Sequence, residues 1–300
     1  MDIAINTDIL CSTNTPEPYL KVIAEAGFTH LHWCHHWNSD FFYTSSEIAR
    51  IALWLKEYGL KLLDIHGSAG KEKCFFSNIE YIRQAGVELV LNRVRMFAEL
   101  GGEGGLIMHI PSMRSNCTPE ELAVYPLYVE PLMRSLDELM PELEKHHVVL
   151  AVENMGTDDF ELIGKLIRTY PAECLGITYD SGHGNIAPVN GLEHIAGLKE
   201  RLEVLHLNDN DGIADLHMSI GTGTVDWERM AEIIATSRYA ETGRPMSLEL
   251  SMMRRTPFAV PELKAENQPY QNILDFLIDA RRRGEAFTEK VNSYRRLHNR

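Results

Sequence analysis

The sequence lacks the segments that direct a chain to a membrane or to the secretory pathway. It contains no run of about 18 apolar residues, the length expected of a membrane-spanning helix. The opening stretch, MDIAINTDIL, has neither the basic segment nor the long apolar core of a secretory signal, and its pattern is typical of a first β-strand. We therefore expect a cytoplasmic protein with no membrane span.

Cysteine is scarce and dispersed. The chain has five cysteines and no CxxC pair, the five being Cys11, Cys34, Cys74, Cys117 and Cys174. An odd, scattered set argues against a disulfide framework and fits reduced thiols in the cytoplasm. It also argues against a cysteine-based zinc site, because such a site needs clustered thiolates.

Basic residues are outnumbered by acidic ones. The chain has 29 Lys and Arg against 43 Asp and Glu, a formal net charge of −14. Nucleic-acid binding depends on Lys and Arg at the phosphates, so a nucleic-acid partner is not expected. Bound cations would neutralise part of this charge.

Short apolar runs rich in β-branched residues alternate with helical patterns along the chain. The expected strands cover residues 3–6, 29–33, 61–65, 105–110, 148–152, 176–179, 202–207 and 246–250. Between two of them, Leu132, Leu136, Leu139 and Leu143 recur at helical spacing and form one apolar face. Nearly continuous apolar strands that alternate with helices indicate a parallel sheet covered by helices.

Eight strand–helix units in 300 residues predict an α/β fold, a (β/α)8 TIM barrel. We expect a single domain over residues 1–300, with 284–300 as a C-terminal helix or tail. A doubly wound open sheet is the alternative. Such a sheet usually has a glycine-rich first turn, whereas Asn6, Thr7 and Asp8 follow the first strand here.

Residue types that bind metals stand at the carboxyl ends of consecutive predicted strands. They are His66, His109, Glu153, Asp180 with His183 three residues later, His206 and Glu249. In a barrel these ends meet at one face, where the loops build the active site. Any one of them alone is more often a hydrogen-bonded core residue, but burying the whole set is costly unless a shared cation compensates it. Carboxylate and imidazole together suit Mn, Zn, Fe, Co or Mg.

The segments after strands two and seven add to this face. Asp215 and His217 form a D-x-H pair that could supply two more ligands, and Asp226 is the expected N-cap of the next helix. His35 and His36 are expected in loop or substrate-edge roles. The loop 34–45 also carries the aromatic side chains Trp37, Phe41, Phe42 and Tyr43, and is interpreted as a ligand-facing lid or a dimer contact, which would make a homodimer plausible.

The segments VEN, YDSGHGN, HLND and the D-x-H block with GxGxVDW together resemble the xylose isomerase-like TIM barrel superfamily, in particular its sugar phosphate isomerase/epimerase group, related to endonuclease IV. The resemblance implies the ligand set of ketose epimerases, formed here by Glu153, Asp180, His206 and Glu249. Endonuclease IV holds three zinc ions. Its larger set would add His66, His109, His183, Asp215 and His217, and we expect these residues to bind the substrate or additional metal ions here.

This resemblance implies an enzyme, a sugar or sugar-phosphate isomerase or epimerase that depends on a divalent metal ion. Glu153 and Glu249 would be the catalytic bases, transferring protons on opposite faces of the carbon beside a carbonyl. Three alternatives stay open. They are a lyase similar to inosose dehydratases, a zinc phosphodiesterase similar to endonuclease IV, and a sugar-binding protein without catalysis. The phosphodiesterase is disfavoured because loop 34–45 has no Lys or Arg to grip a duplex.

One departure from the ketose epimerases concerns the substrate. Those enzymes tend to place an Arg shortly after the histidine of strand seven, but residues 208–214 contain none. Arg114, Arg254 and Arg255 are candidate anion holders instead, because arginine binds phosphate or carboxylate in a bidentate manner. The identity and phosphorylation of the sugar, the reaction type and the number of metal ions stay open.

Overall fold

Eight parallel strands form the centre of the molecule. The computed structural model describes residues 2–10, 15–68, 70–111, 126–155 and 159–298. The strands are β1 (Ile3–Asn6), β2 (His30–Trp33), β3 (Lys61–His66), β4 (Leu106–Met108), β5 (Leu150–Glu153), β6 (Leu175–Asp180), β7 (Leu202–His206) and β8 (Met246–Leu248). They pair in chain order from β1 to β7, and β8 pairs with β1. A parallel bridge between Leu207 and Leu248 joins the two ends, so the fold is a TIM barrel.

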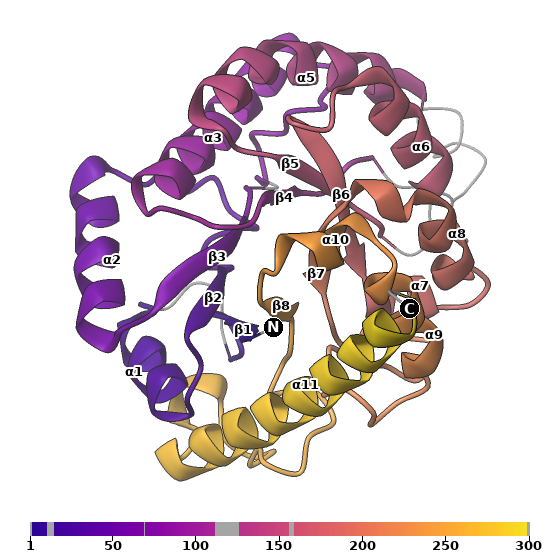
Figure 1. Ribbon diagram of the computed structural model, residues 1–300. Coiled ribbons are helices and arrows are strands. Elements are labelled where there is room, and N and C mark those ends of the chain that lie inside the picture. Colours follow the sequence, from indigo (N-terminus) through magenta and orange to yellow (C-terminus); the bar gives the residue numbers. More distant parts are fainter. Residues whose placement is uncertain (1, 11–14, 69, 112–125, 156–158, 299–300) are drawn as a thin grey trace.

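Helices surround this barrel (Figure 1). The α-helices are α1 (Glu17–Glu25), α2 (Ser45–Tyr58), α3 (Glu80–Glu99), α5 (Pro126–His146), α6 (Asp159–Thr169), α7 (Ser181–Asn185), α8 (Gly191–Leu198), α9 (Trp227–Ala235), α10 (Arg238–Thr242) and α11 (Tyr270–His298). Two 3-10 helices, η1 (Lys199–Arg201) and η2 (Ala265–Asn267), complete the set in the described chain. Residues 284–298 form the second half of α11, which packs against α9 and α1.

Local chemistry explains several helix ends. Thr44, the residue before α2, forms a capping box with Glu47. Asp226 caps α9 as predicted, because its side chain accepts a hydrogen bond from the backbone N–H of Arg229. Gly101, just after α3, has a φ of +67°, which glycine adopts without steric cost. No helix in the described ranges has the length and apolar character needed to cross a membrane.

Several strand bounds differ by one or two residues from the sequence-based prediction, and two of these differences concern site residues. β4 ends at Met108, so His109 lies just beyond the strand. β8 ends at Leu248, so Glu249 follows the strand and does not lie within it. At β8 the physical reason is visible, because the backbone N–H of Leu250 donates to the side chain of Asn6 at 2.8 Å in place of a strand partner.

The alternation of side chains along the strands separates an outer core from the inside of the barrel. Most buried apolar residues belong to one cluster, including Ile65, Ile177 and Leu205 on the strands. Ile107, Ala151 and Val204 form a separate small cluster. Glu153 and His206 lie two residues beyond Ala151 and Val204, so the pleat points them into the barrel above this apolar layer.

Candidate metal centre

Four side chains converge at the carboxyl ends of adjacent strands. Glu153, Asp180 and His206 are the last residues of β5, β6 and β7, and Glu249 follows β8. One ligand atom from each lies within 4.8 Å of the corresponding atoms of the other three. The Glu153 and Asp180 carboxylates and the His206 ring are at most 1% exposed, and the side chain of Glu249 is 13% exposed. The fold thus gathers three carboxylates and an imidazole in one largely buried space.

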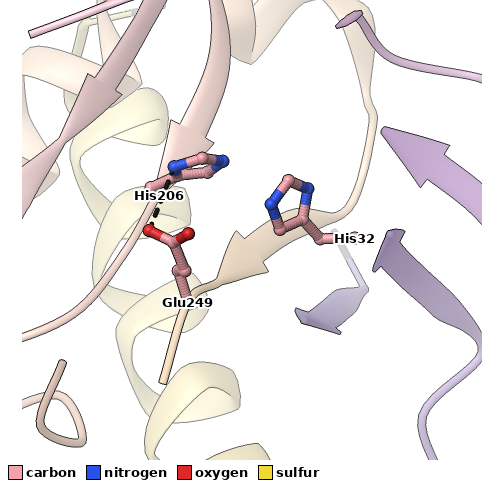
Figure 2. Close-up of side chains that lie close together, drawn as sticks. All are labelled: His32, His206 and Glu249. Atoms are coloured by element: carbon pink, nitrogen blue, oxygen red, sulfur yellow. Dashed lines mark ion pairs between the residues drawn. The ribbon is translucent and has the colours of Figure 1, made fainter. Parts of the chain in front are cut away.

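His206 lies between two of these carboxylates. Its Nδ1 is 2.9 Å from Oε1 of Glu153 and 3.1 Å from Oε2 of Glu249, and the second contact is the dashed line in Figure 2. Burial disfavours the charged imidazole, but the charges of Glu249 and Glu153 outweigh it and raise the pKa of His206 well above its usual range. Without a metal ion, a protonated His206 therefore compensates part of the negative charge.

Asparagines position the third carboxylate. The side chain of Asn154 bonds both the backbone N–H and the carbonyl of Asp180, at 2.8 and 3.0 Å. The amide of Asn208 donates to Oδ2 of Asp180 at 2.8 Å, and the backbone N–H of His183 donates to Oδ1 at 2.7 Å. Burial raises the pKa of Asp180 to about 7, although the charge of His183 opposes this. These bonds give a structural role to the asparagines of VEN and HLND.

A second group shares Glu153 with the first. Ligand atoms of His66, His109 and Glu153 also lie within 4.8 Å of one another. The Nε2 atoms of His66 and His109 are 3.2 Å apart, and Nε2 of His109 is 3.0 Å from Oε2 of Glu153. Burial, together with the neighbouring His109, lowers the pKa of His66 to about 3. His66 is therefore neutral at physiological pH and has a ring nitrogen lone pair to offer to a ligand.

The D-x-H pair completes the cluster. Oδ2 of Asp215 lies 3.1 Å from Nε2 of His217 and 3.7 Å from Nε2 of His183. His217 in turn lies 3.7 Å, through Nδ1, from Oε2 of Glu249. Although burial opposes it, the hydrogen bond to Asp215 raises the pKa of His217 to about 9, with a further contribution from Glu249. All nine predicted site residues thus belong to one connected group.

The chemistry of this group fits a divalent cation. Three carboxylates within one buried space are costly to ionise together unless positive charge compensates them. Nitrogen and oxygen ligands suit Mn, Fe, Co, Zn or Mg. Glu153, Asp180, His206 and Glu249 are the residues that would hold such an ion.

Two charged candidates from the sequence are neutralised. Nη1 of Arg254 donates to the carbonyl of Asp215 at 2.6 Å and lies 3.8 Å from its carboxylate. Nη1 of Arg255 lies 2.6 Å from Oδ2 of Asp211. Both guanidinium groups are therefore already paired with aspartates of the loop after β7, which weakens their role as anion holders. Arg114 lies outside the described residues.

The loop after β2 brings one aromatic ring onto the site. The ring of Trp37 lies 4.5 Å from that of His66 and 5.2 Å from that of His109, measured between centroids. Phe41 instead stacks on His36 at 4.1 Å, and the hydroxyl of Tyr43 donates to the carbonyl of His35. Trp37 is thus the aromatic residue of this loop that lies against His66 and His109, while the role of the loop as a lid or a dimer contact stays a prediction.

Sequence reasoning missed two polar residues inside the barrel, His32 on β2 and Asp64 on β3. Both are buried, and Nδ1 of His32 bonds Oδ1 of Asp64. The sequence-based prediction rested on strand ends alone, where His66 stands. Asp64 lies two residues before His66 and therefore points to the same side of β3. Strand alternation was the signal that could have found it.

The comparisons with known proteins agree with this fold. Residues 20–280 match the family described as the xylose isomerase-like TIM barrel. Uncharacterized protein y4fM of Sinorhizobium fredii (strain NBRC 101917 / NGR234) is 29% identical over 257 residues, or 78% of this chain and 81% of that protein. A D-tagatose 3-epimerase-like protein has a TM-score of 0.70 at 18% identity, covering 98% of this chain and 99% of its own. The IolI protein with a binding zinc atom has a TM-score of 0.64 at 13% identity, and the match covers 98% of this chain and 99% of that protein's chain.

Proposed function

This chain belongs to the xylose isomerase-like TIM barrel family, and on that premise we propose that it is a metal-dependent isomerase or epimerase of a sugar or sugar phosphate. The observation that carries the proposal is the convergence of Glu153, Asp180, His206 and Glu249, whose ligand atoms lie within 4.8 Å of one another. A bound divalent ion would polarise a substrate carbonyl and make the neighbouring C–H more acidic.

Glu153 and Glu249 are the proposed proton-transfer groups. They come from the end of β5 and from the residue after β8, and both approach Nδ1 of His206. Burial opposes ionisation, but the charge of His206 holds the pKa of both carboxyls well below the usual range, so both are ionised. One carboxylate takes the proton from the carbon beside the carbonyl. The other, after it has taken a proton from solvent, returns that proton to the opposite face and inverts that carbon.

Exchange of carbon-bound hydrogen tests this proposal across several classes of sugar at once. Ketoses, ketose phosphates and inososes are incubated in D2O with the protein and with Mn, Co, Mg, Fe or Zn. Deuterium should enter at the carbon beside the carbonyl of one of them, as followed by NMR. Absence of exchange from every compound with every metal contradicts the proposal, and loss of water would identify the lyase alternative.

Substitution of either carboxylate should abolish this exchange. Glu153→Gln and Glu249→Gln should each reduce turnover by about 100- to 10,000-fold, because the amide cannot accept the proton. Glu142→Gln, on α5, is the matched control and should keep full activity. Metal content is measured in parallel, so that a lost base is separated from a lost ligand. Full turnover by either metal-loaded variant would exclude the two-base mechanism.

A second candidate is a phosphodiesterase with several metal ions. It is favoured by one observation, that the group of His66, His109 and Glu153 shares a carboxylate with the first group. Elemental analysis of the purified protein distinguishes the two. About one metal ion per chain supports the sugar enzyme, whereas two or three zinc ions per chain direct the next assay to DNA with an abasic site.

A further inference from the structure

A buried pair of residues lies beside the four proposed ligands. His32 is fully buried, Asp64 is 1% exposed, and they come from the neighbouring strands β2 and β3. Nδ1 of His32 makes a short hydrogen bond to Oδ1 of Asp64. No step of the proposed function uses either residue, yet burying a carboxylate and an imidazole inside the barrel is costly. We therefore expect the pair of His32 and Asp64 to serve a function at the neighbouring site.

The free edge of the His32 ring faces His206. The two ring centroids are 4.5 Å apart, and Figure 2 shows the rings facing each other with Glu249 beside them. Nε2 of His32 and Nε2 of His206 are both buried, and within the described chain neither has a hydrogen-bond partner. One ligand-type atom from each of His32, His206 and Glu249 lies within 4.8 Å of the other two.

The hydrogen bonds of the two rings define complementary roles. Because the carboxylate of Asp64 can only accept, Nδ1 of His32 carries a proton, and Nε2 of the neutral ring is an acceptor. His206 is arranged the opposite way, since its Nδ1 faces Glu153 and Glu249. If Nδ1 binds a metal ion, the proton of the neutral ring is on Nε2. A donor on His206 then faces an acceptor on His32.

We propose that His32, oriented by Asp64, is a positioning residue that accepts a hydrogen bond from Nε2–H of His206 when Nδ1 of His206 binds the metal ion. Histidine ligands of metals usually donate their second ring N–H to a partner that sets the tautomer and the ring orientation. A neutral imidazole offers only one lone pair, so His206 cannot serve a second ion through Nε2. This inference rests on the metal centre of the proposed function.

Metal affinity tests the role directly, without any enzymatic assay. His32→Leu removes the acceptor and should weaken binding of Co²⁺ or Zn²⁺ by about 10- to 100-fold, measured by competition with a chelating dye. His32→Gln keeps a carbonyl acceptor and should bind more tightly than His32→Leu. His30→Leu is the matched control, because His30 begins the same strand at the opposite end from the site. Its affinity should equal that of the wild type.

Asp64→Asn separates this role from simple packing. The amide keeps the shape of the carboxylate but can donate to Nδ1 of His32, which shifts the ring proton to Nε2. Two N–H groups would then face each other, so Asp64→Asn should lose metal affinity although His32 is present. The absorption spectrum of bound Co²⁺ should change as well. Circular dichroism verifies that each variant is folded.

Each outcome decides between stated possibilities. Folded His32→Leu and Asp64→Asn variants with wild-type affinity and an unchanged Co²⁺ spectrum overturn the positioning role. Loss of one metal equivalent in His32→Leu also overturns it and makes His32 a ligand. A wild-type protein that binds no divalent metal overturns this inference together with the metal centre. A wild type that binds metal but exchanges no sugar proton overturns only the proposed function.

Discussion

Four histidines surround the carboxylate of Glu153. Nitrogen atoms of His206 and His109 lie 2.9 and 3.0 Å from its oxygens, and those of His183 and His66 lie 3.7 and 3.8 Å away. Despite burial, the charge of His206 and the hydrogen bonds to His109 and His206 hold the pKa of this carboxyl well below its usual range, so it is ionised. At the scale of single residues, Glu153 therefore belongs to both proposed ligand sets. One set contains Asp180, His206 and Glu249, and the other contains His66 and His109.

Metal uptake should depend on pH in a defined direction. In the metal-free protein the pKa of His206 is raised well above its usual range, and burial raises that of Asp180 to about 7. A metal ion must displace these protons. Affinity should therefore rise between about pH 6 and about pH 8, by about tenfold per pH unit for each proton displaced. Calorimetry in buffers of different ionisation enthalpy measures the protons released, and a pH-independent affinity would contradict this prediction.

Trp37 should contribute mainly to substrate binding. Its ring contacts His66 and His109 and would offer an apolar face to the proposed sugar substrate. Trp37→Ala should raise KM by about tenfold with little change in kcat, because stacking acts equally on bound substrate and transition state. Phe42→Ala is the control, since Phe42 is 46% exposed. An unchanged KM in Trp37→Ala would remove this residue from the binding site.

The loop after β7 is the element that positions the D-x-H pair, and one buried carboxylate organises it. Asp209 accepts hydrogen bonds from the backbone N–H groups of Gly221, Gly223 and Val225 and from Nε1 of Trp227, at 2.9 to 3.0 Å. Asp209 and Met218 also exchange backbone hydrogen bonds at 2.8 and 2.9 Å. The loop therefore returns to the end of β7 just after His217, which places that ring beside Glu249.

Asp209→Asn should destabilise this loop. The new amide group would face N–H donors in a buried site and leave some of them unsatisfied, at a cost of about 2–4 kcal/mol. For a domain of this size the melting temperature should fall by about 3–6 °C in a thermal denaturation experiment. Asp226→Asn, in the same segment, should be neutral, because Asn and Asp are equally good N-caps. Equal melting temperatures for the two variants would show that the Asp209 bonds contribute little.

At the scale of the whole molecule, the proposed ligands lie around the closure of the barrel. They come from β5, β6 and β7 and from the residue after β8, and the described residues join β7 to β8 by the bridge between Leu207 and Leu248. An ion held by all four residues would connect β7 and β8, the first and last strands in the order of the sheet. It would also offset part of the net charge of −14, which destabilises the compact state through self-repulsion.

Removal of the metal should lower thermal stability. An ion present at 100 times its Kd stabilises the folded state by about 2.7 kcal/mol, provided that the unfolded chain does not bind it. In a 300-residue chain this corresponds to a fall of about 4 °C in melting temperature after treatment with a chelator. Restoring the ion should reverse the fall. A melting temperature that no divalent ion changes would argue against a site that links these strands.

The sequence by itself determined the barrel and the face that carries the site. Strand and helix periods are local properties, and parallel strands that end in polar residues must present them at one face. Only the tertiary structure decided which side chains meet. The contact between His32 and Asp64 depends on the register between β2 and β3, which shifts between Leu31 and His32. The pairing of Arg255 with Asp211 depends on loop geometry, with a φ of 49° at Arg255. These contacts join residues far apart in the chain, so no local pattern specifies them.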